Sequence, residues 1–152
     1  MKINADYLIM GSGVAGLFFA IKAAEHGSVA VVTKRERRES NTQYAQGGIA
    51  AVIDDRDSFA SHVADTLLAG DGLCDRAIAE AVVSEGPEVV RELLAIGAVL
   101  NEERPGELAL GREGGHAHAR VVHADDTTGR EVTRALVRAV EGLPQVALYD
   151  HH

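Results

Sequence analysis

The hydrophobic pattern changes from strand-like to helical near the start of the chain. Residues 7–10 form a short apolar run, a glycine-rich turn follows, and residues 14–26 carry apolar side chains at helical spacing. A second apolar run, Val29–Val32, comes directly after Gly27 and Ser28. We therefore predict a strand over 6–10, a helix over 14–26 and a second, parallel strand over 29–32, which together form a βαβ unit.

The turn between the first strand and the helix has the spacing GxGxxG. Gly11 suits the backbone angles of the turn, Gly13 lets a pyrophosphate approach the main chain, and Gly16 lets the helix lie close to the strand. The N–H groups and the positive dipole end of the helix then face the phosphates. The spacing alone also fits an ordinary glycine-rich turn, but the flanking strand and helix favour a dinucleotide site.

Composition and charge narrow the class of protein. The chain has 152 residues, of which 46% are hydrophobic, and this suffices for one buried core. A net charge of −8 disfavours nucleic-acid binding. No apolar run reaches membrane-spanning length, and the N-terminus leaves no room for a signal peptide, so we expect a soluble cytoplasmic protein without membrane contact. The single cysteine, Cys74, excludes an internal disulfide and is expected to be buried.

The end of the second predicted strand departs from the usual ribose-binding pattern. Rossmann units commonly place Asp or Glu there to accept hydrogen bonds from the ribose hydroxyls. This chain has Thr33 and Lys34 instead. The departure weakens the case for NAD and leaves the adenosine ribose to the Lys34 ammonium or to backbone groups. We expect the rest of the basic cluster, residues 35–38, to be solvated surface.

A polar segment of small residues follows at 39–52. It shows neither strand alternation nor a helical stripe, and its side chains are short hydrogen-bonding groups. Gly47 and Gly48 allow backbone N–H groups to approach a planar or anionic ligand. The alternative is an ordinary loop rich in turn-forming residues.

Helices are predicted in the middle of the chain. Asp57 or Ser58 caps a helix over 59–69, Asp75 caps a second helix that runs through Val83, and Pro87 stands near the start of a third. We interpret all of them as scaffold.

The C-terminal part is predicted to contain one helix and one strand. The helix begins at Thr127 or Thr128, and the strand covers 146–149. His62, in the middle of the earlier 59–69 helix, is expected to be half-buried or on the surface and to have no catalytic role.

Residues 112–126 hold the densest cluster of titratable groups. Alternation of His116 and His118 predicts a strand, and the cationic neighbours Arg112 and Arg120 oppose a divalent ion, so we expect no metal site. Arginine, imidazole and glycine backbone together suit a small dicarboxylate and can stabilise charge that develops during redox chemistry.

Two sequence blocks resemble a known family. GSGVAG at 11–16 and SNTQYAQGGIAA at 40–51 are similar to the N-terminal part of the FAD-binding domain of the succinate dehydrogenase, fumarate reductase and L-aspartate oxidase flavoprotein family. The resemblance covers the whole chain and is greatest to the L-aspartate oxidase branch. It implies an α/β, Rossmann-like FAD-binding domain. Residues 1–152 would be its N-terminal, incomplete part, with the capping and C-terminal helical domains absent.

In this family the two blocks wrap FAD. The resemblance therefore assigns the pyrophosphate to the glycine-rich turn, the adenosine side to Lys34, and the pyrophosphate-to-flavin portion to 41–48. Asn41 stands where the dehydrogenases and many reductases have a histidine bonded covalently to the flavin, so we expect non-covalent FAD. The residues assigned to the cofactor are Gly11, Ser12, Gly13, Val14, Ala15, Gly16, Lys34, Asn41, Thr42, Gln43, Tyr44, Ala45, Gln46, Gly47 and Gly48.

The same resemblance gives Glu113 a catalytic role. In the L-aspartate oxidase branch the Arg-Glu-Gly-Gly-His stretch, here residues 112–116, lies beside the flavin. Glu113 would face the substrate ammonium and favour an amino acid over succinate. The alternative for Glu113 is a structural salt bridge to Arg112 or Arg120. Residues 123–129 also resemble a family segment close to the cofactor.

The implied activity is oxidation of L-aspartate to iminoaspartate, with hydride transfer to flavin N5 and reoxidation by O2 or fumarate. This is a step of quinolinate and NAD biosynthesis, and quinolinate synthase would consume the imine. Family members are several times longer and supply an arginine acid/base from segments that have no counterpart here, so we expect no turnover from this chain alone. The alternatives are a fumarate reductase or succinate dehydrogenase-type flavoprotein and a non-catalytic nucleotide-binding module.

Overall fold

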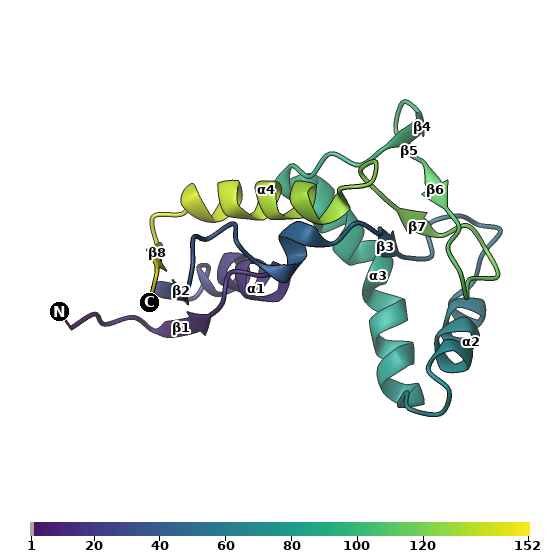
Figure 1. The fold of residues 1–152 in the computed structure, drawn as a ribbon, viewed down its shortest axis with the longest axis horizontal. Coiled ribbons are helices and arrows are strands. Elements are labelled where there is room, and N and C mark those ends of the chain that lie inside the picture. Colours follow the sequence, from purple (N-terminus) through teal and green to yellow (C-terminus); the bar gives the residue numbers. More distant parts are fainter. Residues whose placement is uncertain (1) are drawn as a thin grey trace. The chain divides into compact units, whose positions relative to one another are not determined.

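The computed structural model describes residues 2–152. The chain divides into two compact units, whose elements are labelled in Figure 1. Unit 1 contains the residues up to Gln46, together with Ile96–Ala98 and Thr127–His152. Unit 2 contains Gly47–Ala95 and Val99–Asp126. The chain thus leaves unit 1 directly after Gln46 and returns to it for the last helix and strand.

Unit 1 is built on a parallel sheet with the strand order β1-β2-β8. Tyr7 is in register with Val29, and Val29 with Val146. The predicted βαβ unit and the predicted last strand are therefore confirmed. The elements of unit 1 are β1 (Tyr7–Met10), α1 (Val14–Ala23), β2 (Val29–Thr33), the 3-10 helix η1 (Asn41–Tyr44), α4 (Thr128–Glu141) and β8 (Val146–Asp150).

Helix α1 ends three residues before the predicted limit, at Ala23. The N–H groups of His26 and Gly27 both donate to the Ala23 carbonyl oxygen, at 2.9 and 3.2 Å. The chain tightens into a turn here because Gly27 packs against Asp6, whose carboxylate accepts the Ser28 N–H at 2.8 Å.

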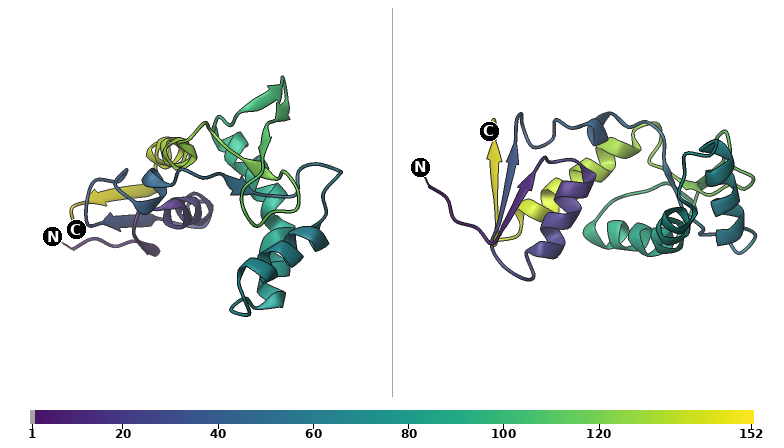
Figure 2. Two further views of the ribbon diagram at one scale, coloured as in Figure 1. Left: turned by 45° about the vertical axis from the view of Figure 1, so that its right-hand side comes forward. Right: turned by 90° about the horizontal axis from the view of Figure 1, so that it is seen from below.

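The core of unit 1 lies between the sheet and two helices. Val29 and Val31 of β2 are almost fully buried, and α1 contributes Leu17. Helix α4 contributes Leu136 and other residues of one face, including Val140, as its helical spacing indicates. Figure 2 shows α1 and α4 beside the three strands of this sheet. Burial of these apolar faces fixes the turn between β1 and α1 in place.

Unit 2 combines two helices with short antiparallel strands. Its sheet has the order β3-β7-β6, and a separate hairpin joins β4 to β5. Ala51, Val90, Leu100 and Val122 form its buried core. The elements are β3 (Ile49–Ala50), α2 (Phe59–Ala69), α3 (Arg76–Ile96), β4 (Glu102–Arg104), β5 (Glu107–Leu108), β6 (Leu110–Gly111) and β7 (Val121–Val122).

Helix α2 matches its prediction at both ends. The Ser58 hydroxyl accepts the Ser61 N–H at 3.1 Å and caps the first turn, while Gly70 occupies the C-cap. Asp57, the other predicted cap, accepts the Ser58 N–H at 2.7 Å and has a different partner described below.

The prediction of two helices over 75–96 is wrong, because α3 runs from Arg76 to Ile96 with Pro87 inside it. The missing N–H and the ring of an internal proline cost about 3 kcal/mol. One apolar face nevertheless continues past the proline, with Val83 before it and Val90 after it both buried. Packing of this apolar face offsets the free-energy cost of the internal proline. Neither α3 nor any other helix within residues 2–152 is long and apolar enough to cross a membrane.

Two further predictions in unit 2 are wrong. Residues 114–118, between β6 and β7, form a turn and a bend instead of a strand. Gly115 has a φ of 85°, and the Ala117 N–H donates to the Asp65 carboxylate rather than to a strand. Cys74 is exposed and not buried, because it follows the turn that connects α2 to α3.

Candidate cofactor and substrate sites

The glycine-rich turn of unit 1 requires glycine at its first and last positions. Gly11 has a φ of 105°, and its N–H donates to the Val32 carbonyl oxygen at 2.8 Å. A Cβ on Gly16 would overlap the Gly11 carbonyl oxygen. At Gly13, by contrast, a Cβ would meet only the Thr42 hydroxyl, at 3.5 Å. The middle glycine is therefore not needed for packing, and it leaves the main chain open to a ligand.

Side chains near this turn hold its shape. The Ser12 hydroxyl donates to the Thr33 hydroxyl at 3.2 Å, and both residues are buried. The Val14 N–H at the start of α1 donates to the Thr42 hydroxyl at 3.0 Å. Thr42 thus takes one of the N–H groups that the helix start leaves without an intrahelical acceptor. The two sequence blocks, separated along the chain, meet through this hydrogen bond.

A cleft of about 560 Å³ opens at the carboxyl ends of β1 and β2. This is the edge at which open α/β sheets bind their ligands. Five of the predicted cofactor residues line it, namely Gly11, Ser12, Lys34, Asn41 and Tyr44. The other lining residues are Met10, Val32, Thr33, Arg35, Glu39, Ser40 and His152. Predicted residues of unit 1 outside the lining are Gly13, Val14, Ala15, Gly16, Thr42, Gln43, Ala45 and Gln46.

The sequence reasoning assigned none of these other lining residues to the cofactor, and they include Arg35, Glu39 and Ser40. The Tyr44 hydroxyl donates to both Glu39 oxygens, at 2.9 and 2.8 Å, and this hydrogen bond raises the pKa of Tyr44. Arg35 forms an ion pair with Glu39 at 3.2 Å. The carboxylate that the end of β2 lacks is therefore present in the cleft. In the sequence, only the position of Glu39 between the basic cluster and Ser40 could have indicated this carboxylate.

Ser40 supports the fit of the cleft to a polar ligand. Its Oγ is buried and has no hydrogen-bond partner. An unpaired buried hydroxyl is costly unless a ligand or water satisfies it. Together with the open backbone at Gly13 and the Lys34 cation, this orphaned hydroxyl suits the phosphates and ribose hydroxyls of FAD.

Helix α4 begins against η1, and Gly129 makes this contact possible. Its N–H donates to the Ala45 carbonyl oxygen at 2.9 Å, and a Cβ at this position would overlap the Thr42 carbonyl oxygen. The C-terminal segment therefore supports η1, which carries Thr42. Within residues 123–129, which resemble the family, Gly129 is needed for this close contact between α4 and η1.

In unit 2, Gly47 and Gly48 lie close to two other segments. A Cβ on Gly48 would overlap the Val122 carbonyl oxygen, and a Cβ on Gly47 would lie 3.4 Å from Glu113 Oε1. Glu113 itself is exposed. The Glu113 carboxylate thus lies beside Gly47, although the two residues are far apart in the sequence.

The alternative of a structural salt bridge at Glu113 is wrong. Within residues 2–152, no ion pair joins Glu113 to Arg112 or Arg120. Arg112 Nε donates to the His116 carbonyl oxygen at 2.9 Å. The Glu113 carboxylate is therefore not neutralised by either arginine.

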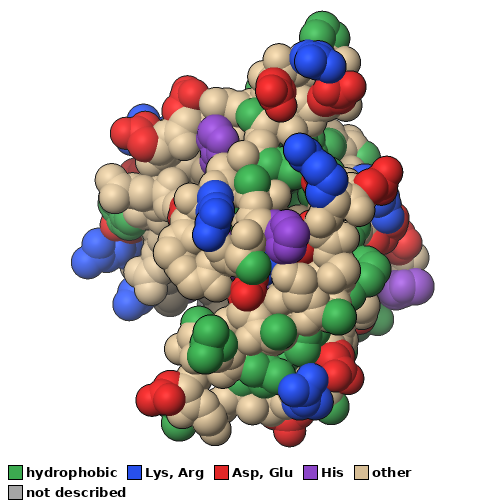
Figure 3. Space-filling view, turned by 90° about the vertical axis from the view of Figure 1, so that its right-hand side faces the viewer, with side chains coloured by type: hydrophobic (Ala, Val, Ile, Leu, Met, Phe, Trp, Pro, Cys, Tyr) green, Lys and Arg blue, Asp and Glu red, His purple; other side chains and the backbone are tan. Residues whose placement is uncertain are grey.

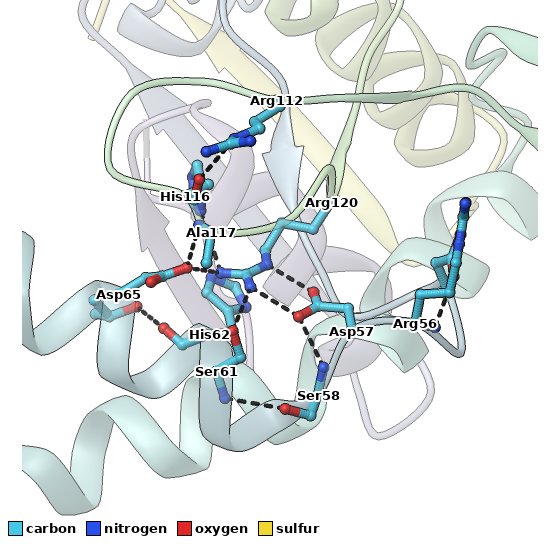
Figure 4. Close-up of polar contacts among 12 residues, drawn as sticks. Arg56, Asp57, Ser58, Ser61, His62, Asp65, Arg112, His116, Ala117 and Arg120 are labelled. Atoms are coloured by element: carbon cyan, nitrogen blue, oxygen red, sulfur yellow. Dashed lines mark hydrogen bonds and ion pairs between the residues drawn. The ribbon is translucent and has the colours of Figure 1, made fainter.

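Arg120 occupies the centre of a buried network, shown in Figure 4. Its side chain is 0% exposed. Nε and Nη2 donate to the two oxygens of Asp57, at 2.7 and 2.8 Å. Nη1 donates to Asp65 at 2.7 Å. Burial opposes the charge of Arg120, but the hydrogen bonds to both carboxylates outweigh it and raise its pKa. The prediction that Arg120 joins an anion site is wrong, since its donors are already taken.

His62 is buried, contrary to the expectation of a half-buried or surface side chain. It is 7% exposed, and its Nδ1 has no hydrogen-bond partner. Burial first, and the charges of Arg120 and His116 next, lower the pKa of His62. Its ring packs edge-on against that of His116, with centroids 5.8 Å apart. Among residues 2–152, no group of three or more His, Cys, Asp or Glu side chains is arranged to hold a metal ion.

The face shown in Figure 3 carries acidic, basic and histidine side chains interspersed with one another. No continuous basic area covers this face. The lack of a continuous basic area on this face and the net charge of −8 both disfavour nucleic-acid binding.

The fold and the cleft define a dinucleotide-binding domain of the α/β class, with a glycine-rich turn at the carboxyl edge of a parallel sheet. Residues 6–152 match the family described as FAD binding domain, and the chain belongs to this family. The cofactor of the family is FAD.

Similar curated proteins include L-aspartate oxidases of plants and bacteria. The chain is 52% identical to L-aspartate oxidase 2-a, chloroplastic, of Nicotiana tabacum, over 97% of this chain and 23% of the relative. It is 48% identical to the L-aspartate oxidase of Streptomyces coelicolor, over 91% of this chain and 24% of that protein. The chain thus spans about a quarter of the length of the curated relatives it matches.

Solved structures with the same fold include relatives of a second kind. A variant of E. coli quinol fumarate reductase FrdA superimposes with a TM-score of 0.94 at 33% identity, over 99% of this chain and 26% of that chain. A flavocytochrome c3 fumarate reductase superimposes with a TM-score of 0.81 at 22% identity, over 95% of this chain and 26% of that one, which shows the fold alone.

Proposed function

We propose that this chain is the N-terminal part of the FAD-binding domain of a longer flavoenzyme that oxidises L-aspartate to iminoaspartate. The observation that carries the proposal is the 52% identity to an L-aspartate oxidase along 97% of the chain. The position of Glu113 beside Gly47, without an arginine partner, supports it. Capping and C-terminal helical domains would be supplied by the rest of the longer protein. The chain alone would then lack turnover.

The proposed cofactor site uses the fifteen residues assigned to FAD from the sequence. The backbone at Gly13 and the start of α1 would hold the pyrophosphate, and Lys34 and the Ser40 hydroxyl would bind the adenosine side or the phosphates. When bound, FAD supplies the acceptor for a hydride. Asn41 has no imidazole nitrogen with which to form a covalent bond, so the flavin is held non-covalently.

The proposed substrate contact is an ion pair between Glu113 and the ammonium group of aspartate. Oxidation removes a hydride from the amine-bearing carbon and a proton from the nitrogen, which leaves the carbon–nitrogen double bond of the imine. Fumarate or O2 would take up the electrons, and quinolinate synthase would consume the unstable imine. We also propose a cytoplasmic location, although the tobacco relative is named as chloroplastic.

The test compares two reductants of the flavin. In the complete flavoenzyme under anaerobic conditions, L-aspartate is expected to bleach the flavin absorbance and succinate to do so far more slowly. Glu113→Gln is expected to lower the rate with aspartate by about tenfold or more, since a hydrogen bond to a charged group contributes roughly 1.5–3 kcal/mol. The exposed Glu107, changed to Gln, is the matched control. Absence of flavin reduction by aspartate would refute the activity.

The second candidate is a fumarate reductase-type flavoprotein, favoured by the TM-score of 0.94 to FrdA. Reduction of the flavin by succinate but not by aspartate would establish it. The third is a non-catalytic nucleotide-binding module, which would retain no flavin. Acid precipitation of the FAD-loaded protein shows whether the flavin is bound non-covalently or covalently. We expect yellow colour in the supernatant, whereas colour in the precipitate would show a covalent bond and contradict the role of Asn41.

A further inference from the structure

The loop that carries Glu113 is held by unit 2 although most of its side chains are exposed. Residues 112–119 connect β6 to β7. The His116 N–H donates to the Glu113 carbonyl oxygen at 3.3 Å, which closes a turn between these two residues. Arg112 donates to the His116 carbonyl oxygen, and Asp65 accepts the Ala117 N–H at 2.7 Å. Asp65 therefore links the middle of α2 to the loop.

Arg120 anchors the end of this loop. Its guanidinium joins Asp57, just before α2, to Asp65 within α2, and the Asp57 side chain is 1% exposed. Burying one cation with two carboxylates carries a large desolvation cost, and well-packed apolar residues at such places often serve stability equally well. A fork with fixed donor directions instead specifies one geometry. The network thus fixes the position of the 112–119 loop relative to α2.

Arg120 also determines which nitrogen of His116 carries the ring proton. Arg120 Nη1 lies 3.4 Å from His116 Nδ1. A guanidinium has five N–H donors and no acceptor, so Nδ1 accepts this hydrogen bond. The ring proton is then on Nε2, which becomes a donor. Figure 4 shows His116 and Asp65 among the residues around the Arg120 guanidinium.

We propose that Arg120 positions the residues that contact the substrate. It does so because it fixes the 112–119 loop and holds His116 in the Nε2–H tautomer. The loop then presents a carboxylate acceptor at Glu113 and an imidazole donor at His116, in a geometry set before any ligand arrives. This pair is complementary to a small molecule that carries both an ammonium and a carboxylate group. The inference rests on the proposed function and assigns part of its substrate selectivity to a buried network.

The first experiment measures the loop without using the reaction. Hydrogen exchange of the FAD-loaded flavoenzyme, read by mass spectrometry, follows the peptide that contains residues 112–119. Asp65→Asn is expected to speed exchange in this peptide by about tenfold, because the acceptor for the Ala117 N–H loses its charge. The control is Glu80→Gln, which removes an exposed carboxylate paired with Arg76 on α3. Unchanged exchange in the Asp65 variant would overturn the positioning role.

The second experiment tests the tautomer. The amide nitrogen of glutamine can replace a donor at Nε2, whereas asparagine reaches only the place of Nδ1. We expect His116→Gln to keep KM for aspartate within about twofold and His116→Asn to raise it about tenfold, with a smaller change in kcat. Arg120→Lys, which keeps the charge and loses the fork, is expected to raise KM as His116→Asn does. Equal effects of Gln and Asn at position 116 would contradict the tautomer assignment.

The two experiments separate the inference from the proposed function. If aspartate fails to reduce the flavin of the unaltered enzyme, the proposed function is wrong. Hydrogen exchange of the Asp65 variant then decides whether the ion pair of Asp65 with Arg120 positions the loop. If aspartate reduces the flavin but the loop exchanges equally in the Asp65 and Glu80 variants, only the positioning role is wrong. The thermal midpoint of each variant shows whether it is folded.

Discussion

Replacement of Gly16 by alanine is expected to destabilise unit 1. A Cβ at this position would overlap the backbone carbonyl of Gly11 and lie 3.3 Å from the Ile9 side chain. Real Cβ atoms essentially never come within 3.0 Å of such a neighbour. The obstacle is backbone, so α1 must move away from the turn, and no side-chain rotation relieves the overlap.

Two opposing effects set the magnitude. Alanine in place of glycine inside a helix gains roughly 0.5–1 kcal/mol. Overpacking of a tight contact costs about 1–3 kcal/mol and more where backbone must shift. Leu17 and Ala20 on the same helix are almost fully buried, so movement of α1 also disturbs the core. We therefore expect a net loss of roughly 2 kcal/mol in the free energy of unfolding.

Gly13→Ala is the matched comparison, with the same chemical change at the neighbouring glycine. Its Cβ would meet only the Thr42 hydroxyl, at an ordinary contact distance of 3.5 Å. The loss in stability is expected to be about 1 kcal/mol or less, the difference between glycine and alanine at an N-cap. The methyl group narrows the approach to the main chain, so FAD affinity is expected to fall about tenfold or more.

The assay measures both quantities on both variants. Urea unfolding of the cofactor-free protein gives the free energy of unfolding, and flavin fluorescence titration gives the dissociation constant of FAD. We expect Gly16→Ala to lose stability and Gly13→Ala to lose affinity. Equal stability of the two variants, or unchanged FAD affinity for Gly13→Ala, would refute the assignment of distinct roles to the two glycines.

Three further predictions follow from contacts elsewhere in the chain. Gly129→Ala, whose Cβ would overlap a carbonyl oxygen of η1, is expected to lower the free energy of unfolding by about 2 kcal/mol in urea, and an unchanged midpoint would contradict the packing. Hydrogen bonds from Arg56 lower the pKa of Asp54 to about 2, so an NMR titration should find this low value and Arg56→Ala should return it toward 3.8. Burial opposes the charge of both Asp57 and Asp65. The pKa of Asp57 is nevertheless lowered, mainly by hydrogen bonds from Arg120, and that of Asp65 by hydrogen bonds from the Ala117 N–H and Arg120. Their stabilisation is therefore complete above about pH 4 and is lost as pH falls through the lowered values. Acid should therefore lower the urea midpoint more steeply in the unaltered protein than in Asp65→Asn.

The parts of the fold that depend on local patterns could be predicted from the sequence. The strand at 7–10, the GxGxxG turn and the second strand are specified by adjacent residues, and their order along the chain already indicates a parallel pair. The cap at Ser58 and the glycine at position 70 define α2 in the same local way.

The errors arose where distant contacts decide the structure. Pro87 predicts a helix boundary from local rules, yet burial of Val83 and Val90 on one face keeps α3 continuous. Alternation at His116 and His118 predicts a strand, yet the carboxylate that captures the neighbouring N–H comes from α2. The residues next to Ala117 in the sequence do not indicate that its N–H donates to Asp65.

The misassignment of Arg120 shows the same limit for chemistry. Arginine near histidine and glycine indicates an anion site, because these groups recognise carboxylates when they are exposed. Asp57 and Asp65 stand far earlier in the chain, and they satisfy the guanidinium before any ligand can. The buried arginine therefore acts through the loop that it holds. The proposed substrate contact in unit 2 is instead Glu113, which is exposed and lies beside Gly47. In our proposal Arg120 makes the loop rigid and Glu113 binds the substrate, so variants at the two positions should affect different observables.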